Sequence, residues 1–178
     1  QDLRIDDRHY QPRAIIGKIS SLKNNLADPE TFAKHSAGFG FDEAVHRTYG
    51  LYEERLRESG GVDFDDLLML TVRLLERHPD VLAHYQQLFQ HVLIDEYQDT
   101  NHAQYRIVQL LTAKSRSLCV VGDDDQSIYK FRGADITNIL NFEKDFPDTT
   151  IIKLEQNYRS TENILGAESA VVKRNLGR

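Results

Sequence analysis

Two adjacent carboxylates end a short apolar run at Val92–Glu96, which reads Val-Leu-Ile-Asp-Glu. A carboxylate at a strand end can hold Mg²⁺ directly or through water, and a second carboxylate can take a proton from an attacking water. Phosphoryl transfer requires this division of labour. Asp95 is therefore a candidate metal ligand, and Glu96 a candidate general base. An isolated Asp-Glu pair more often caps a helix or faces solvent, so the pair needs other parts to make a site.

Polar residues that suit a phosphate follow this run and two later apolar runs. Gln98 and Gln126 are neutral amides that could hydrogen-bond a terminal phosphate or the water that attacks it. Arg159 has the planar fork that matches phosphate oxygens, and Tyr158 offers a flat face for a base. The alternative for each residue by itself is an ordinary exposed loop position.

The segment Gln126–Ala134 interleaves two aromatic rings with two cations, in the order Tyr129, Lys130, Phe131, Arg132. Bases of single-stranded nucleic acid stack on such rings while phosphates meet the cations, and each stacked base contributes about 1–3 kcal/mol. Tyr129 and Phe131 could equally be core residues, and spacing alone leaves both interpretations open.

The elements that must position these residues form two zones with different periodicity. Residues 1–61 are helical in pattern, with a helix from Pro12 to about Leu26 and another from Phe41 to about Leu56. Asp63 then predicts the N-cap of a helix with Phe64, Leu67, Leu68, Val72 and Leu75 on one face. His78-Pro79 ends that helix, and Asp80 predicts the cap of a short helix that reaches Phe89.

Residues 62–178 go on to alternate short apolar runs with helical spacing. The runs at 91–94, 118–121 and 150–154 do not alternate with polar residues, which is typical of parallel strands buried on both faces. Helices are expected near 103–111, 136–140 and 160–172, so the fold class is α/β. Because the carboxyl ends of parallel strands share one edge of a sheet, the three polar loops are expected to converge there.

Composition narrows the class of protein. The 178 residues include 40% hydrophobic and 28% charged residues, carry a net charge of −6, and contain one cysteine. The acidic balance argues against a nonspecific nucleic-acid coat, so any contact with nucleic acid must be local. Cys119 lies in an apolar run and is expected to be buried. No run is long enough to cross a bilayer and no signal segment opens the chain, which predicts a cytoplasmic protein without a membrane partner.

Three segments together resemble helicase motifs of the UvrD/Rep/PcrA family, superfamily 1 helicases that move 3′ to 5′ on single-stranded DNA with ATP. They are Asp95–Asn101 (DEYQDTN), Val121–Ala134 (VGDDDQSIYKFRGA) and Leu154–Ser160 (LEQNYRS). Asp63–Leu68 (DFDDLL) also resembles the segment where the family's chain returns from an inserted helical subdomain. The resemblance covers almost the whole chain, more loosely before Gly61.

This resemblance implies a RecA-like P-loop NTPase core with a parallel sheet flanked by helices, incomplete here, plus an N-terminal helical subdomain. Residues 1–61 would belong to the inserted subdomain and 62–178 to the first RecA-like domain. The implied function is an ATP-dependent DNA helicase or translocase in replication or repair, which acts on single-stranded DNA and on junctions with duplex. The implied location is the bacterial cytoplasm, in association with DNA.

Roles carry over to matching positions. Asp95 would bind Mg²⁺, Glu96 would activate water, and Gln126 would sense the γ-phosphate of ATP. By the same resemblance, Tyr158 would stack on adenine and Arg159 would act as an arginine finger. DNA contacts would fall to the three residues Tyr129, Phe131 and Arg132. Phe131 stands where many relatives carry Trp, so stacking is expected to survive with a smaller ring.

The chain lacks a Gly-x-x-x-x-Gly-Lys-Ser/Thr phosphate loop, since its only Gly-Lys pair, Gly17-Lys18, precedes Ile19. It also opens at Gln1 without an initiator Met. We therefore expect a central fragment of a larger helicase that hydrolyses ATP negligibly when isolated. Two alternatives remain: the helicase part of a recombination helicase-nuclease, and a DNA-binding module that hydrolyses nothing. Retention of Asp95, Glu96, Gln126 and Arg159 argues against the latter.

Overall fold

The computed structural model describes residues 5, 9–36 and 38–174, with the backbone but not the side chain of Arg132. This described part is mostly helical and contains one small parallel sheet. The helices are α1 (Pro12–Asn24), α2 (Pro29–His35), α3 (Phe41–Glu58), α4 (Phe64–Arg77), α5 (Pro79–Leu88), α6 (His102–Thr112), α7 (Thr137–Leu140), α8 (Phe142–Asp145) and α9 (Glu162–Val172). The strands are β1 (Val92–Ile94) and β2 (Leu118–Val120).

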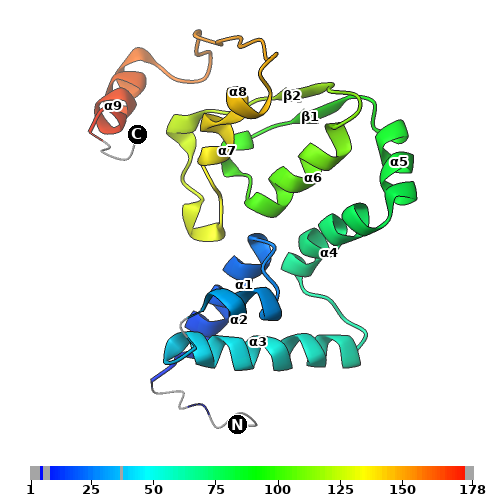
Figure 1. Ribbon diagram of the computed structural model, residues 1–178. Helices are drawn as coiled ribbons and strands as arrows, with labels where there is room; N and C mark the ends of the chain where they lie inside the picture. The colour runs from blue at the N-terminus through cyan, green and yellow to red at the C-terminus, as the bar shows by residue number, and fades with distance from the viewer. Residues whose placement is uncertain (1–4, 6–8, 37, 175–178) are drawn as a thin grey trace.

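Helices α1, α2 and α3 pack around a small apolar core, which lies below the sheet in Figure 1. Its buried residues are Ile15, Ile19, Phe32, Ala44, Val45 and Tyr49. The predicted helices α1 and α3 are confirmed, but α2 was not predicted. It forms because Asp28 accepts a hydrogen bond from the backbone of Thr31 at 2.8 Å and Pro29 fits the first helical position. Helix α1 itself already ends at Asn24, so the Asp-Pro pair begins α2 and does not end α1.

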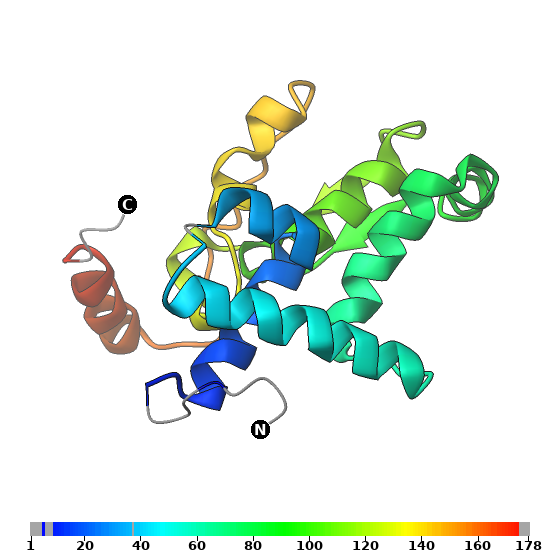
Figure 2. The ribbon, with the colours of Figure 1, turned by 60° about the horizontal axis from the view of Figure 1, so that its bottom comes forward.

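Helix α4 leads from the helical group to the sheet (Figures 1 and 2). The predicted N-cap is confirmed, because Asp63 accepts from the backbone of Asp66 at 2.7 Å and Asp66 accepts from the backbone of Asp63 at 3.1 Å. The predicted apolar face is partly wrong: Phe64 is 88% exposed and Leu67 is 55% exposed. The face that packs instead carries the buried residues Asp66, Met69, Val72 and Leu75.

A buried lysine joins three of these helices. Lys23 of α1 is fully buried and lies 2.6 Å from Glu53 of α3 and 2.7 Å from both Asp63 and Asp66 at the start of α4. Burial alone would lower the pKa of Lys23, but its hydrogen bonds to the carboxylates raise that pKa above the ordinary value. The ammonium group therefore stays charged and fixes α4 against α1 and α3.

The sheet pairs β1 with β2 in parallel, with Val92 opposite Leu118 and Ile94 opposite Val120. Helix α6 lies along one side of these strands (Figure 1). The central residues are exposed, with Leu93 at 76% and Cys119 also exposed. Burial on both faces and burial of Cys119 were therefore wrong predictions. Alternate residues of a strand point to opposite faces, and among the described residues nothing covers the face of Leu93 and Cys119.

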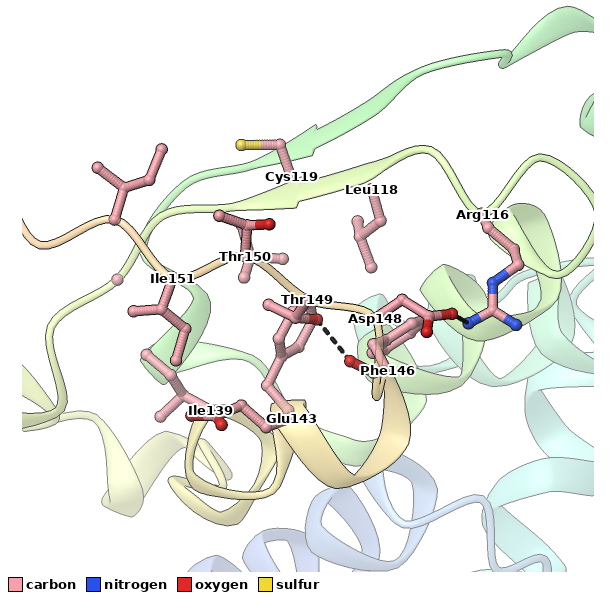
Figure 3. A pocket seen from close by; sticks show the side chains of 14 residues that line it. Arg116, Leu118, Cys119, Ile139, Glu143, Phe146, Asp148, Thr149, Thr150 and Ile151 are labelled. Carbon is pink, nitrogen blue, oxygen red and sulfur yellow. Dashed lines mark hydrogen bonds and ion pairs between the residues drawn. The ribbon is translucent and has the colours of Figure 1, made fainter.

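The third predicted strand, 150–154, is also wrong, because this segment has no regular secondary structure and does not pair with the sheet. A cavity of about 460 Å³ separates it from the outer edge of β2 (Figure 3). Apolar side chains that line this cavity are Leu118, Val120, Ile139, Phe142, Phe146, Ile151 and Ile152. Without a neighbouring strand to share main-chain hydrogen bonds, an apolar run does not become part of a sheet.

The remaining helices follow the expected order. Helix α5 begins at Pro79 with His78 as its N-cap, so Asp80 lies inside the first turn and is not the predicted cap. The helix expected near 136–140 is confirmed as α7, whereas the short helix α8 that follows it was not predicted. Helix α9 stands away from the rest of the molecule in Figures 1 and 2. None of the helices in the described residues is long and apolar enough to span a membrane.

Candidate functional site

The carboxylate pair lies where β1 ends, as predicted. Both Asp95 and Glu96 are exposed, and the Asp95 Oδ1 atom accepts from the backbone N–H of Glu96 at 2.9 Å. Glu96 has φ 52° and ψ 43°, the left-handed conformation. That conformation costs a residue with a Cβ about 1–2 kcal/mol. The chain thus turns sharply directly after the strand.

Gln98 connects the pair to the loop after β2. Its side chain is 1% exposed, donates from Nε2 to Glu96 Oε2 at 2.7 Å and accepts at Oε1 from the backbone N–H of Asp123 at 3.0 Å. The 3₁₀ turn Tyr97–Asp99 brings Gln98 to this position. Two of the three predicted loops therefore meet at the carboxyl edge of the sheet.

Glycine at position 122 makes this approach possible. A Cβ added there would lie 2.7 Å from Gln98 Oε1 and 2.8 Å from Ile139 Cδ1. Both distances are too short for a real contact, so an added side chain would force the side-chain ends of Gln98 and Ile139 to shift, and it would also lie a tight 3.3 Å from the backbone N of Tyr97. Gly122 is thus a packing requirement of the site.

Gln126 lies one step further along the same chain of hydrogen bonds. Its Nε2 atom donates to Asp123 Oδ2 at 2.8 Å, while Asp123 Oδ1 accepts from the backbone of Asp125 at 3.0 Å. Asp123 is exposed, but both of its carboxylate oxygens accept hydrogen bonds. The sequence did not single out this residue. The signal that could have found it is its place directly after a strand and a tightly packed glycine.

The aromatic segment is exposed, which excludes the alternative that its rings are core residues. Tyr129 is 37% and Phe131 is 78% exposed, and their ring centroids lie 5.9 Å apart at 41°. Gly133 ends the turn with φ 88°. It lies next to Asn24 of α1, because a Cβ added to Gly133 would be 3.9 Å from the Asn24 side chain. The side chain of Arg132, the third predicted DNA contact, lies outside the described residues.

Asn24 is a second residue that the sequence did not indicate. Only 5% exposed, it donates to Asp65 Oδ1 at 2.9 Å and accepts from Asn101 Nδ2 at 2.6 Å. Asn101 is the N-cap of α6 and directly follows the carboxylate loop. The end of α1 therefore touches α4, α6 and the turn at Gly133.

Tyr158 and Arg159 do not join the first two loops. Tyr158 is 92% exposed, and the backbone of Arg159 donates to Asn157 Oδ1 at 2.8 Å in a local turn. The hydrogen bonds of Gln156, Arg159 and Ser160 are local and run to Asn157 in the same segment. The predicted convergence holds for two loops and not for the third, since segment 150–154 does not join the sheet.

No group of three or more His, Cys, Asp or Glu side chains is placed to hold a metal in the part of the chain that the structure describes. Mg²⁺ commonly uses one or two carboxylates and completes its shell with water and phosphate. An exposed carboxylate such as Asp95 is compatible with that mode of binding.

Comparison with known proteins identifies the class. The family described as UvrD/REP helicase N-terminal domain matches residues 1–147, so the chain belongs to this family. Among individual relatives, the ATP-dependent DNA helicase PcrA of Bacillus subtilis is 51% identical over 178 residues, which is 100% of this chain and 24% of the relative. PcrA of Leuconostoc citreum is 54% identical over 99% of the chain, and PcrA of Staphylococcus epidermidis is 52% identical over 98%. The chain spans 24% of the length of each of these relatives.

Proposed function

We propose that the chain contributes part of the ATP site and DNA contact of an ATP-driven helicase that moves 3′ to 5′ on single-stranded DNA. The observation that carries this proposal is the hydrogen-bonded junction between the loop of Asp95 and Glu96 and the loop that leads to Gln126. Ligands of open parallel sheets bind beyond the carboxyl ends of the strands, where this junction lies. The family and the PcrA relatives support the same function.

Each residue has a proposed role. Asp95 contributes a ligand to Mg²⁺, Glu96 accepts a proton from the attacking water, and Gln126 contacts the γ-phosphate. Tyr158 stacks on the adenine of ATP, and Arg159 meets the developing charge on the γ-phosphate. Bound Mg²⁺ would supply charge neutralisation between the phosphates. The exposed carboxylate of Asp95 suits such a partly hydrated ion.

On the same proposal, Tyr129 and Phe131 stack on DNA bases, and Arg132 neutralises phosphate. The two rings are exposed and adjacent, as stacking on successive bases requires. Single-stranded DNA, and junctions with duplex, are the proposed partners, and the bacterial cytoplasm is the proposed location.

We also propose that residues 62–178 belong to a RecA-like core and residues 1–61 to a helical insertion. The outer edge of β2 faces the cavity of about 460 Å³, and residues 150–152 form the opposite wall. Figure 3 shows Leu118 and Ile151 on opposite sides of this space. A further parallel strand placed there could share hydrogen bonds with β2 and with the opposite wall, which would bring the loop of Arg159 into the sheet.

The test is ATP hydrolysis by the complete product of the gene, with and without single-stranded DNA. We expect DNA-stimulated hydrolysis that Glu96→Gln abolishes, because an amide cannot accept the proton. Glu54→Gln, on the exposed side of α3, is the matched control and should retain activity. The 178-residue chain alone is expected to hydrolyse ATP negligibly. Binding of DNA by the complete product without any hydrolysis would instead support a non-hydrolysing module, and nuclease activity that accompanies hydrolysis would support a helicase-nuclease.

A further inference from the structure

We infer that Gln98 is a positioning residue that holds Glu96 in place and links it to Gln126 through Asp123. This inference rests on the proposed function, because it concerns how the proposed base is oriented. It differs from the direct phosphate contact that the sequence suggested for Gln98. Three hydrogen bonds in series carry it, from Glu96 to Gln98, from Gln98 to Asp123 and from Asp123 to Gln126.

The first step is the burial of Gln98. At 1% exposure its amide has no free surface for a phosphate, although Glu96 and Gln126 at the two ends of the series are exposed. Both ends of the amide are already used by the protein. Nε2 keeps a second N–H and Oε1 a second lone pair, but at this burial a ligand could reach them only if the surrounding loops moved apart. Loss of the two existing partners would leave buried polar atoms unpaired, at a cost of about 1–3 kcal/mol each.

The second step is the direction of the amide. A backbone N–H can only donate, so the Oε1 atom of Gln98 must face Asp123. The Nε2 atom must then face the Glu96 carboxylate, which when ionised can only accept. A flipped amide would satisfy neither partner. Because Gly122 has no Cβ, it leaves the space that Oε1 occupies, since an added Cβ would lie 2.7 Å from that atom.

The third step is the link to the phosphate sensor. The Asp123 carboxylate accepts from the side chain of Gln126 and from the backbone of Asp125, so it follows the position of the loop after β2. If Gln126 moves to meet a phosphate, its bond to Asp123 must lengthen or shift. The backbone N–H of Asp123 belongs to the same residue and transmits that change to Gln98, and thereby to Glu96. The Glu96 side chain is otherwise exposed, so its hydrogen bond from Gln98 Nε2 at 2.7 Å restrains its direction.

The functional test replaces Gln98 in the complete product of the gene. Gln98→Met keeps the length of the side chain and removes both hydrogen bonds. We expect kcat for ATP hydrolysis to fall about 10- to 100-fold, as is typical when a group that orients an active-site residue is removed. KM for ATP should stay unchanged. Gln98→Met and Asp123→Ala together should cost less than the sum of their separate effects, because both interrupt one series of bonds.

Gln86→Met is the matched control. Gln86 is another buried glutamine, 8% exposed, and donates to the backbone carbonyl of Leu110 at 2.7 Å on α6. Like Gln98→Met, the Gln86→Met variant loses a buried amide. Because Gln86 lies outside the series of hydrogen bonds from Glu96 to Gln126, kcat of this variant should match that of the unaltered protein. An unchanged kcat in Gln98→Met overturns the inference. A rise in KM for ATP with kcat preserved also overturns it, since that result marks a direct phosphate contact.

A second measurement does not depend on catalysis. In the 178-residue chain, Gln98→Met should speed hydrogen exchange of the Asp123 amide, which loses its acceptor, whereas Gln86→Met should leave that exchange unchanged. If the Asp123 amide exchanges at an unaltered rate in Gln98→Met, the proposed hydrogen-bonded link is overturned, whatever ATPase activity is measured. If the complete protein hydrolyses no ATP while exchange responds as expected, the proposed function fails and the linkage itself stands.

Discussion

The buried Lys23 cluster offers a prediction whose size follows from its geometry. Lys23→Met keeps most of the side-chain volume but leaves Glu53, Asp63 and Asp66 together without their cation. Removal of one partner from a buried ion pair costs about 3–5 kcal/mol. Two of the carboxylates retain about a fifth of their exposure, at 22% and 21%, so water screens them in part and the lower value of about 3 kcal/mol applies.

Urea unfolding of the 178-residue chain, followed by circular dichroism, measures this loss. With a slope of about 2 kcal/mol per molar urea, a loss of 3 kcal/mol lowers the unfolding midpoint by about 1.5 M. Lys114→Met removes an exposed lysine after α6 and serves as the control, with a midpoint close to that of the unaltered chain. Equal midpoints for Lys23→Met and Lys114→Met would refute the reasoning that the cluster fixes α4 to α1 and α3.

The pH dependence of the same unfolding provides a second check. Burial by itself would raise the pKa of Asp63, but hydrogen bonds from Lys23, the backbone of Asp66 and Tyr52 lower it below the ordinary value. Its stabilising contribution is therefore present above about pH 4 and lost as the pH falls through the lower folded pKa. The pKa of Lys23 is raised on folding, so its contribution is complete below about pH 10 and lost at more alkaline pH. Lys23→Met should reduce the alkaline loss but not abolish it, because burial also raises the pKa of Tyr49 and of Tyr97. The variant should become more stable as acid neutralises the three carboxylates.

Three further predictions concern the site and the sheet. In the same urea assay, Gly122→Ala should destabilise the chain by about 1–3 kcal/mol, because the added methyl would meet Gln98 Oε1 at 2.7 Å. Gly166→Ala in α9 is the control and should not destabilise the chain, because the space around Gly166 is open. Cys119 is exposed on the uncovered face of the sheet and should react with a thiol reagent in the folded chain, so reaction only after unfolding would contradict this exposure. In fluorescence anisotropy, the chain should bind single-stranded DNA weakly and less at high salt, and Phe131→Ala should weaken binding further; affinity that Phe131→Ala leaves intact would exclude this ring as a contact.

Capping and breaking residues allowed much of the helical framework to be predicted from sequence. Asp63 with Asp66 three residues later specified the start of α4, and His78-Pro79 specified its end, since these signals act through local backbone geometry. The covered side of α4 could not be predicted in the same way. Apolar residues such as Leu67, Leu70 and Leu74 lie on its exposed side, while Met69 and Val72 are buried. Periodicity shows that the helix has an apolar side, but the elements that pack against the helix decide which of its sides is covered.

The same limit explains what was missed at the site. An apolar run such as 150–154 favours an extended chain, but only a partner strand turns it into part of a sheet. A glutamine in a loop is equally compatible with a ligand contact and with an internal hydrogen bond, and the sequence does not distinguish them. The structure does distinguish Gln98 from Gln126, because one is buried between two protein partners and the other is exposed. Gly122 explains the difference. Because Gly122 has no side chain, it leaves the space that the Gln98 amide fills, and Gln98 is therefore the glutamine that is buried.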